Sequence, residues 1–349
     1  MSFNVAVVGC GRMGKLHARV LSELPETTLA GVIDRNASTA EAVARQRDCP
    51  VFATPEEAAA QVDAAIISVP TLDHLVAAEP FLKAGKSVLI EKPLAPDVAT
   101  GQRILELAAA SGAIVQVGHT ERYNPAVLAM KQHNVVPKFI EAHRISPFTF
   151  RSADVGVVLD MMIHDIDLVL MLAGSRVIDV QAVGVNVVSG PEDICNARLT
   201  FDNGCVANIT ASRLAIKTER KMRLFSEEAY MSVDFAKKIG IIIDKTANRD
   251  VIQMAREMDV DDLAQAAAEM DYKELIKVQE LKVDDSAEPL KTQILGFRAA
   301  VADGAECQCS GDEGLMAVQV ATDIVEKIKA HRWDGDDSAR QGLDILEKH

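Results

Sequence analysis

A lysine and a proline interrupt an apolar run in the first third of the chain. Val88–Ile90 has the pattern of a buried strand end, and Glu91-Lys92-Pro93 follows at once. Open α/β sheets hold their ligands at the carboxyl ends of parallel strands. We therefore predict that the amine of Lys92 faces a substrate or cofactor at such an end.

A second pair of candidate reactive residues lies in the apolar stretch 157–172. Asp160 and His164 are four residues apart, so on a helix their side chains project from one face. A histidine there can titrate near neutral pH and take a hydroxyl proton, while Asp160 fixes its ring. The alternative is a core histidine, with Asp165 and Asp167 on the exposed face of the helix. The spacing supplies no third ligand, so we predict no metal site.

Three glycines near the N-terminus have the spacing of a dinucleotide-binding loop. They are Gly9, Gly11 and Gly14, and they stand between the strand-like run Phe3–Val8 and the helical spacing of Lys15–Leu24. In this context the glycines allow a tight turn and a close approach to a pyrophosphate, which the helix N-terminus favours. The alternative is a glycine turn that binds nothing, with the nearby Asp34 as the N-cap of a loop.

An acidic residue follows the second apolar run at the spacing that ribose recognition needs. Leu29–Ile33 ends in Asp34, twenty residues after Gly14. A carboxylate there accepts hydrogen bonds from the adenosine ribose and favours NAD over NADP. The neighbouring Arg35 weakens this preference, because an arginine can hold a 2′-phosphate.

The order of strand and helix signals predicts an α/β protein with two domains. Strands and helices alternate as far as Gly118, which is typical of a parallel sheet covered on both faces. Beyond Arg122 the pattern becomes strand-rich, with a hairpin signal at Asp202-Asn203-Gly204. We predict a Rossmann dinucleotide-binding domain over residues 1–121. Residues 122–349 would form an α+β domain with a mainly antiparallel sheet.

Local signals also predict the bounds of individual elements. Helices are expected over 37–47, 55–61 (with Thr54 and Glu57 as a capping box), 156–172 and 314–329 (with Ser310 and Glu313 as a capping box). Strands are expected at 51–52, 138–145, 177–189, 194–201, 204–212, 220–226, 229–234 and 239–244. Residues 276–283 alternate like a strand at each end, with a slip at Gln279-Glu280. Residues 250–271 are acidic and have roughly helical spacing.

Composition excludes several functional classes. The chain has 349 residues, a net charge of −14 and only 4% aromatic residues, which argues against a nucleic-acid-binding surface. The most apolar later stretch contains four ionisable residues, so a membrane span is not expected. The six cysteines lack zinc-site and CxxC spacing. These features predict a cytoplasmic protein with reduced thiols.

Taken in order, three motifs resemble the Gfo/Idh/MocA sugar dehydrogenase family. They are Gly9-x-Gly11-x-x-Gly14 leading into Lys15-Leu16-His17-Ala18, then Glu91-Lys92-Pro93, then Asp160-x-x-x-His164. The resemblance spans nearly the whole chain. It implies that Lys92 and His164 flank the nicotinamide and the sugar carbon being oxidised, with Asp160 supporting His164. It also implies that residues 122–349 form the domain for substrate binding and oligomerisation, with an open-faced, mainly antiparallel sheet.

Further segments resemble the branch of that family that oxidises UDP-N-acetylglucosamine at C3. They are Gly118–Pro125, Phe150-Arg151-Ser152 and Gly156–Asp165. A nucleotide sugar needs cations for its diphosphate. Arg122, Arg144, Arg151 and Arg213 are the candidates, each with an ordinary surface ion pair as its alternative. We favour Arg122 and Arg151.

The motifs and the resemblance together give two sets of predicted site residues. The residues predicted to contact NAD are Gly9, Gly11, Arg12, Met13, Gly14, Asp34, Arg35, Val69, Pro70, Thr71, His74, Glu91, Lys92 and His119. Those predicted to contact the sugar are Arg122, Tyr123, Asn124, Arg151, Asp160 and His164.

The predicted activity is NAD-dependent oxidation of a secondary hydroxyl, with UDP-N-acetylglucosamine as the favoured substrate. A dehydrogenase of a free polyol or hexose such as inositol is one alternative, and a non-catalytic NAD-bound regulator is another. As partners we expect further copies of the chain, in a dimer or tetramer, and an aminotransferase that uses the 3-keto product. We expect no nucleic-acid or membrane partner.

Overall fold

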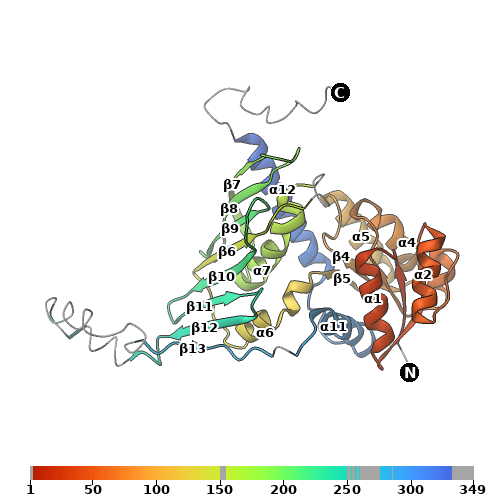
Figure 1. Cartoon of the computed structure of the whole chain (residues 1–349), viewed down its shortest axis with the longest axis horizontal. Helices are drawn as coiled ribbons and strands as arrows, with labels where there is room; N and C mark the ends of the chain where they lie inside the picture. Colours follow the sequence, from red (N-terminus) through yellow and green to blue (C-terminus); the bar gives the residue numbers. More distant parts are fainter. Residues whose placement is uncertain are drawn as a thin grey trace. The chain divides into compact units, whose positions relative to one another are not determined.

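The computed structural model describes residues 3–149, 155–249, 253, 256, 257, 259, 276–284 and 286–331, which form two compact units (Figure 1). The first comprises Met1–Tyr123 and Ala287–Asp323. The second comprises Asn124–Ser286 and the chain from Ile324 onward. The chain thus returns to its first unit after building most of the second.

A parallel sheet forms the centre of the first unit. Its strands lie in the order β2 (Thr27–Ile33), β1 (Phe3–Val8), β3 (Ala64–Ile67), β4 (Ser87–Glu91) and β5 (Val115–Gly118). Every pairing in this sheet is parallel. β3 and β4 are buried along their whole length, as expected for strands covered on both faces. Because the strands run the same way, the residues that follow them meet at one edge.

Helices follow these strands as the sequence predicts. They are α1 (Arg12–Glu23), α2 (Ala37–Arg47), α3 (Pro55–Ala59), α4 (His74–Lys83) and α5 (Val98–Ser111), with 3₁₀ turns η1 (Thr71–Asp73) and η2 (Thr120–Tyr123). Asn36 caps α2 by accepting hydrogen bonds from Ser38 and Thr39. α3 ends two residues before the predicted position. The strand predicted at 51–52 is reduced to a single bridge between Val51 and Val32.

The return segment adds α11 (Pro289–Asp303) and the start of α12 (Gly311–Ala330) to the first unit. Phe297 of α11 makes an edge-to-face contact with Phe3 of β1, with ring centroids 6.3 Å apart. The capping box predicted at the start of α12 is present. Ser310 N donates to Glu313 Oε2 at 2.8 Å, and Glu313 N donates to Ser310 Oγ at 3.3 Å.

The second unit is built on a mainly antiparallel sheet. The strand order is β13 (Gln279–Glu280), β12 (Ile239–Asp244), β11 (Ala229–Asp234), β10 (Glu219–Phe225), β6 (Phe139–Ile145), β9 (Val206–Ser212), β8 (Ile194–Phe201) and β7 (Val177–Val185). Only the β6–β9 pairing among them is parallel. The seven strands predicted between residues 138 and 244 are therefore confirmed, with shifts at their ends.

Helices cover one face of this sheet. α7 (Ile163–Ala173) lies against β6 and β9, and α6 (Pro125–Lys131) lies against β11 and β12 (Figure 1). The helix predicted over 156–172 begins as a π-helical turn, η4 (Val158–Met162), before α7 continues it. The strand indicated over 276–283 shrinks to the two residues of β13. Most of the helix predicted over 250–271 lies outside the described residues.

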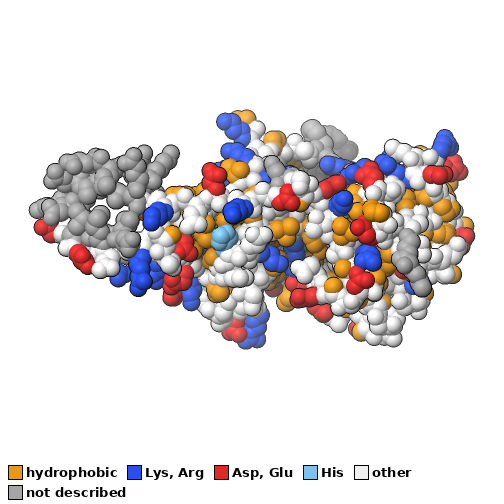
Figure 2. Space-filling model, turned by 90° about the horizontal axis from the view of Figure 1, so that it is seen from below, with side chains coloured by type: hydrophobic (Ala, Val, Ile, Leu, Met, Phe, Trp, Pro, Cys, Tyr) orange, Lys and Arg blue, Asp and Glu red, His pale blue; other side chains and the backbone are white. Residues whose placement is uncertain are grey.

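The described surface has two relevant properties. None of the helices within the described ranges is long and apolar enough to cross a membrane. On the face seen in Figure 2, lysine and arginine side chains are interspersed with aspartates and glutamates. That face therefore presents no continuous basic surface.

Candidate functional site

The turn between β1 and α1 contains two glycines that leave no room for a side chain. Gly9 has φ of +93°, and a Cβ there would lie 2.7 Å from the carbonyl carbon of Ser68. A Cβ on Gly14 would lie 1.7 Å from the carbonyl oxygen of Gly9. The turn itself thus requires glycine at both positions.

The middle glycine of the motif meets a different environment. A Cβ on Gly11 would have no described atom within 4 Å. Gly11 is also the N-cap of α1, and no side chain caps this end and no acidic residue stands in its first turn. The first N–H groups of a helix have no partner within it, and the dipole makes this end positive. Open space bordered by such groups suits a pyrophosphate, so these residues fit a dinucleotide.

Asp34 lies beside this turn. Its Oδ2 accepts a hydrogen bond from Cys10 N at 2.7 Å, and its Oδ1 accepts one from Asn36 N at 2.8 Å. Each carboxylate oxygen retains a second acceptor position, which a ribose hydroxyl can use. The side chain of Arg35 is largely exposed, with Nη1 4.0 Å from the carboxylate of Asp73.

The loop also contains a cysteine that is not a nucleophile. Cys10 is fully buried. Burial, with a smaller contribution from the charge of Asp34, raises the pKa of the Cys10 thiol to about 12. The thiol therefore stays protonated at neutral pH, and its place in the loop is structural.

Lys92 directly follows the last residue of β4. It is partly exposed and precedes Pro93 through a cis peptide bond. The preceding residue, Glu91, is buried, and its Oε1 lies 2.7 Å from Nε2 of His17 in α1. The lysine segment is thus connected to the helix that starts at the glycine loop.

The loop after β3 is linked to the same segment by a second histidine. Nε2 of His74 lies 3.1 Å from the carbonyl oxygen of Val69, and its Nδ1 lies 3.2 Å from that of Leu94. Burial lowers the pKa of His74, and these two carbonyls partly offset the shift. Val69, Pro70 and Thr71 lie at the sheet edge where Lys92 also lies. Because both nitrogens of His74 face backbone oxygens, its direct contact with the cofactor stays a prediction.

The segment after β5 holds the first of the predicted diphosphate ligands. Nη1 of Arg122 donates to the carbonyl oxygen of Gln308 at 2.6 Å and to Oε1 of Glu313 at 2.8 Å. The side chain of Arg122 is buried, and so is that of His119. These bonds tie η2 to the start of α12, and a diphosphate-binding role for Arg122 stays a prediction.

The remaining predicted sugar contacts after β5 are also largely buried. Tyr123 is 4% exposed and Asn124 is 8% exposed. Oδ1 of Asn124 accepts a hydrogen bond from Ala126 N at 3.0 Å and thereby caps α6. Arg151 lies outside the described residues.

Asp160 and His164 lie at the junction of η4 and α7. Both side chains are partly exposed, whereas most of the α7 residues that follow are buried. The two residues are therefore on the accessible side of the helical segment. π-Helical turns occur often at functional sites, and here one carries Asp160.

A carboxylate from the β7–β8 hairpin closes the N-terminus of this helical segment. Oε1 of Glu192 accepts a hydrogen bond from Val158 N at 3.1 Å, and its carbonyl oxygen accepts one from Val157 N at 3.0 Å. A Cβ on Gly156 would lie 2.1 Å from Glu192 Oε1. Negative charge at a helix N-terminus is stabilising, so Glu192 fixes the start of this segment.

The alternative that placed Asp165 and Asp167 on an exposed helix face is wrong. Asp165 is 1% exposed and Asp167 is fully buried. Asp165 forms a two-pronged ion pair with Arg144 of β6, with Nε–Oδ2 at 2.7 Å and Nη2–Oδ1 at 3.0 Å. A buried carboxylate persists when such a pair satisfies its oxygens. Arg144 therefore holds α7 against the sheet. This ion pair explains why an arginine is present at position 144, and no bound diphosphate is needed to explain it.

Arg213 is held in a similar way. Its Nε donates to Oδ1 of Asp193 at 2.8 Å, and its Nη1 donates to the carbonyl oxygen of Val155 at 2.7 Å. Burial alone would raise the pKa of Asp193, but backbone N–H groups led by those of Val188 and Ser189 hold it well below its usual value. Arg213 thus anchors the chain just before η4.

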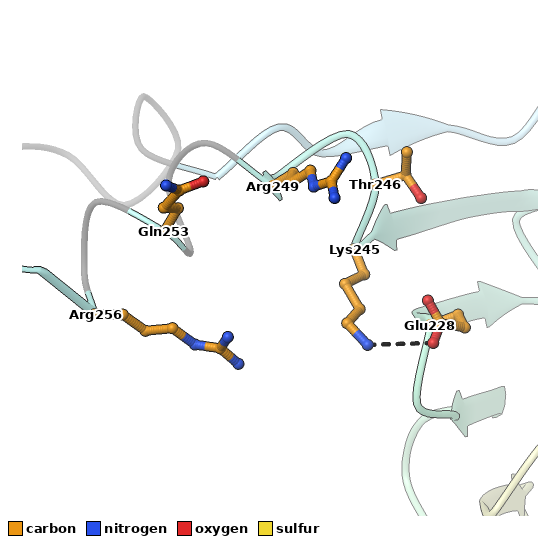
Figure 3. Close-up of a pocket in the computed structure, with 6 residues that line it drawn as sticks. All are labelled: Glu228, Lys245, Thr246, Arg249, Gln253 and Arg256. Carbon is orange, nitrogen blue, oxygen red and sulfur yellow. Dashed lines mark hydrogen bonds and ion pairs between the residues drawn. The ribbon is translucent and has the colours of Figure 1, made fainter.

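A separate cavity lies elsewhere in the second unit. It measures about 560 Å³ and is lined by Glu228, Lys245, Thr246, Arg249, Gln253 and Arg256 (Figure 3). Lys245 Nζ is 3.2 Å from Glu228 Oε1. This cavity contains none of the predicted site residues. Across the described ranges, His, Cys, Asp and Glu side chains nowhere gather in threes as a metal site needs.

The structure thus collects the predicted residues into two groups. In the first unit, the glycine loop, Asp34, Val69–Thr71 and Lys92 share the carboxyl edge of the parallel sheet. In the second unit, Asp160 and His164 share the accessible side of a helix.

Sequence reasoning missed the residues that hold these groups in place. They are His17, Glu192 and the buried acid–arginine pairs of Arg144 and Arg213. For Asp165 the sequence contains one usable signal, which is the apolar segment around it, since a buried charge there needs a partner; the signal does not identify that partner.

Comparison with known families agrees with this architecture. The profile described as "Oxidoreductase family, NAD-binding Rossmann fold" matches residues 3–119, and that described as "GFO/IDH/MocA C-terminal domain" matches residues 132–232. These stretches fall in the two units separately.

Individual relatives extend the likeness. The chain is 39% identical over 230 residues to a UDP-N-acetylglucosamine 3-dehydrogenase of Acidithiobacillus ferrooxidans, covering 66% of this chain and 73% of that protein. It is 25% identical over 349 residues to an inositol 2-dehydrogenase of Rhizobium meliloti, covering 95% and 98% of the two chains. A solved structure of UDP-N-acetylglucosamine 3-dehydrogenase GnnA from A. ferrooxidans superposes with a TM-score of 0.83 at 30% identity, covering 95% of this chain and 99% of that one.

Proposed function

The chain belongs to the Gfo/Idh/MocA oxidoreductase family, and on this basis we propose that it oxidises the 3-hydroxyl of UDP-N-acetylglucosamine with NAD as hydride acceptor. The observation that carries the substrate assignment is the likeness to the A. ferrooxidans enzyme, in both sequence and fold. The open, N–H-lined space at Gly11 supports the nicotinamide dinucleotide.

We propose the following roles for the three candidate catalytic residues. His164 removes the proton from the 3-hydroxyl, and Asp160 orients the His164 ring. Lys92 hydrogen-bonds the same oxygen and stabilises the developing carbonyl through its charge. The bound nicotinamide supplies the hydride acceptor. Removing the amine in Lys92→Ala should lower kcat by roughly a hundredfold or more while NAD still binds. Undiminished turnover would contradict this role.

We propose NAD in preference to NADP because of Asp34. Its carboxylate is adjacent to the glycine loop and would repel a 2′-phosphate while accepting hydrogen bonds from ribose hydroxyls. Arg35 is the residue that would favour NADP.

The test of the substrate is a parallel assay. UDP-N-acetylglucosamine, UDP-glucose, free N-acetylglucosamine and myo-inositol are supplied with NAD, and NADH formation is followed by absorbance. Both 2-oxoglutarate and a 3-keto-sugar aminotransferase, the partner that we propose uses the product, are added in separate arms to draw the reaction forward. Product masses are measured as well. We expect oxidation of the UDP-N-acetyl sugar alone.

One competing function has a specific observation in its favour. The inositol 2-dehydrogenase of R. meliloti aligns along almost the whole chain, although at lower identity. Oxidation of myo-inositol without any UDP sugar would establish this alternative. A protein that binds NAD but oxidises none of the sugars would instead be a regulator.

We also propose that the chain forms a homo-oligomer through the outer face of the eight-stranded sheet. Alternation along the strands puts the exposed side chains of Val183, Val185, Ile194 and Ile239 on this face, opposite the helices. Val183, Val185 and Ile194 lie together on the paired strands β7 and β8, whereas Ile239 lies on β12 near the other end of the sheet. Neighbouring exposed aliphatic side chains are typical of subunit interfaces. Light scattering on the purified protein should give the mass of a dimer or tetramer, and a monomer mass would contradict the proposal.

A further inference from the structure

A buried histidine contacts the carboxylate that precedes Lys92. The side chain of His17 is fully buried, and its Nε2 lies 2.7 Å from Oε1 of Glu91. Because an ionised carboxylate only accepts hydrogen bonds, Nε2 is the donor in this pair. The two residues are 74 positions apart in the sequence, so only the folded first unit brings them together.

The environment of the other ring nitrogen of His17 indicates that filling space is not the only role of this side chain. Its Nδ1 is buried and has no hydrogen-bond partner among the described residues. A buried polar atom without a partner costs free energy. An aliphatic side chain of similar size would fill the space without that cost. What the imidazole adds is a donor to Glu91.

Glu91 is also in close contact with the neighbouring strand, β5. It pairs with Gly118 of β5, where a Cβ would lie 3.0 Å from the Cα of Glu91 and 3.1 Å from its Oε2. The carboxylate of Glu91 is therefore held between α1 and β5. This contact fixes the backbone at position 91, from which Lys92 directly follows.

The chain beyond Lys92 is held by the second buried histidine. Nδ1 of His74 contacts the carbonyl oxygen of Leu94 at 3.2 Å. Lys92 thus lies within a four-residue segment whose first and last residues each contact a buried imidazole. Near a reacting centre, small errors in position cost large factors in rate.

We propose that His17 is a positioning residue for Lys92, acting through Glu91. The inference rests on the role proposed above for Lys92 in sugar oxidation. Because α1 starts at the glycine loop, His17 also connects the helix that would bind the pyrophosphate with the lysine that would meet the sugar. The position of Lys92 then depends on α1 through the contact between His17 and Glu91.

Three variants test the proposal. His17→Met removes the donor and keeps the bulk, and His17→Gln keeps an N–H near the place of Nε2. Val20→Ala is the matched control, because Val20 is buried in the same helix and makes an apolar contribution only. Measurements are kcat and KM for the sugar that the wild type oxidises, the dissociation constant for NAD, and Tm.

We expect a loss of rate that stability does not explain. His17→Met should lower kcat by about ten- to a hundredfold, while the dissociation constant for NAD stays within about twofold. His17→Gln should recover much of that loss. Val20→Ala should lower Tm and leave kcat near the wild-type value. Wild-type kcat in His17→Met would overturn the proposal, and so would equal losses in His17→Gln and His17→Met.

A measurement without substrate separates this proposal from the proposed function. In protein labelled with ¹⁵N-histidine, the Nε2 proton of His17 should exchange slowly with water and resonate downfield. Glu91→Gln should move that signal upfield, because a neutral acceptor binds the proton less strongly. If the signal does not respond to Glu91→Gln, the contact is disproved. If it responds but the wild type oxidises none of the sugars, the proposed function fails and the contact stands.

Discussion

The carboxylate of Glu192 and the N–H of Val158 share a hydrogen bond of 3.1 Å across 34 residues of sequence. Val158 opens the π-helical turn that carries Asp160. Gly156 leaves space for that carboxylate, since a Cβ there would lie 2.1 Å from it. The start of the segment with the candidate acid–base pair is therefore set by a residue of the neighbouring hairpin.

Removing the carboxylate of Glu192 should loosen this helical start. We expect Glu192→Ala to lower the free energy of unfolding by about 1 kcal/mol, the usual effect of losing a helix N-cap. Glu192→Gln should retain most of the stability because its amide oxygen still accepts from Val158. Urea unfolding of the three proteins measures both effects. Equal losses in both variants would show that charge, and not the hydrogen bond, matters.

Substituting alanine at Gly11 and at Gly14 should affect two different properties of the protein, NAD affinity and stability. Gly11→Ala places its Cβ in open space, so Tm should stay near the wild-type value while NAD affinity falls about tenfold or more. Gly14→Ala drives its Cβ into the carbonyl oxygen of Gly9, so Tm itself should drop. Thermal unfolding and titration with NAD separate the two effects. Unchanged NAD affinity in Gly11→Ala would contradict a pyrophosphate at this turn.

Local patterns were sufficient for the parts of the fold that depend on neighbouring residues. The helix predicted over 37–47 has the same bounds in the structure, because Asn36 caps it and alanines favour it. The strand–glycine–helix order at residues 3–24 also holds. Both features depend on residues that are close together in the sequence. Periodicity and capping rules describe interactions over that range.

Contacts between distant residues could not be predicted in this way. The burial of Asp165 depends on Arg144, which comes from another element of the fold. The partner of Glu91 is 74 residues away in α1. In each case the sequence shows a polar residue in an apolar segment but contains no signal for its partner. The strand indicated over 276–283 is shorter in the structure for a related reason, because strand pairing rather than alternation sets its length.

The choice of dinucleotide should depend on the charge of Asp34. Asp34→Ser keeps a small acceptor near Cys10 N but removes the carboxylate. We expect the KM for NAD to rise about tenfold or more and the preference for NAD over NADP to shrink. Initial rates with both cofactors check this. Arg35→Ala is the companion variant and should weaken the use of NADP, because it removes the guanidinium that could hold a 2′-phosphate. An unaltered cofactor ratio in Asp34→Ser would contradict the NAD assignment.

Breaking the buried ion pair of Arg144 and Asp165 should lower the free energy of unfolding more than breaking an exposed ion pair does. Asp165→Leu leaves the buried guanidinium without its carboxylate and should cost about 3–5 kcal/mol of unfolding free energy. Adding Arg144→Met should recover most of that loss, because no buried charge is left unpaired. Urea unfolding measures both. The exposed pair of Glu228 and Lys245 is the control, and Glu228→Ala should change stability by less than about 1 kcal/mol.

His74 should make the fold less stable in mild acid. Burial lowers its pKa in the folded state below 6.5, so the unfolded chain binds more protons than the folded chain just below that pH. The unfolding free energy should therefore fall as pH drops below 6.5, by at most about 1.4 kcal/mol per pH unit for this group, and level off below the folded pKa. His74→Gln should reduce this dependence.

The measurement is the difference in unfolding free energy between wild type and variant, taken by urea titration from pH 8 to pH 5. Carboxylates such as Asp193 respond at lower pH, because hydrogen bonds hold its pKa well below the usual range. His133→Gln, at an exposed position, should leave the pH dependence unchanged. If wild type and His74→Gln lose stability in parallel from pH 7 to pH 5, then protonating His74 does not lower the free energy of unfolding. Its two contacts to Val69 and Leu94 would then both be donated hydrogen bonds.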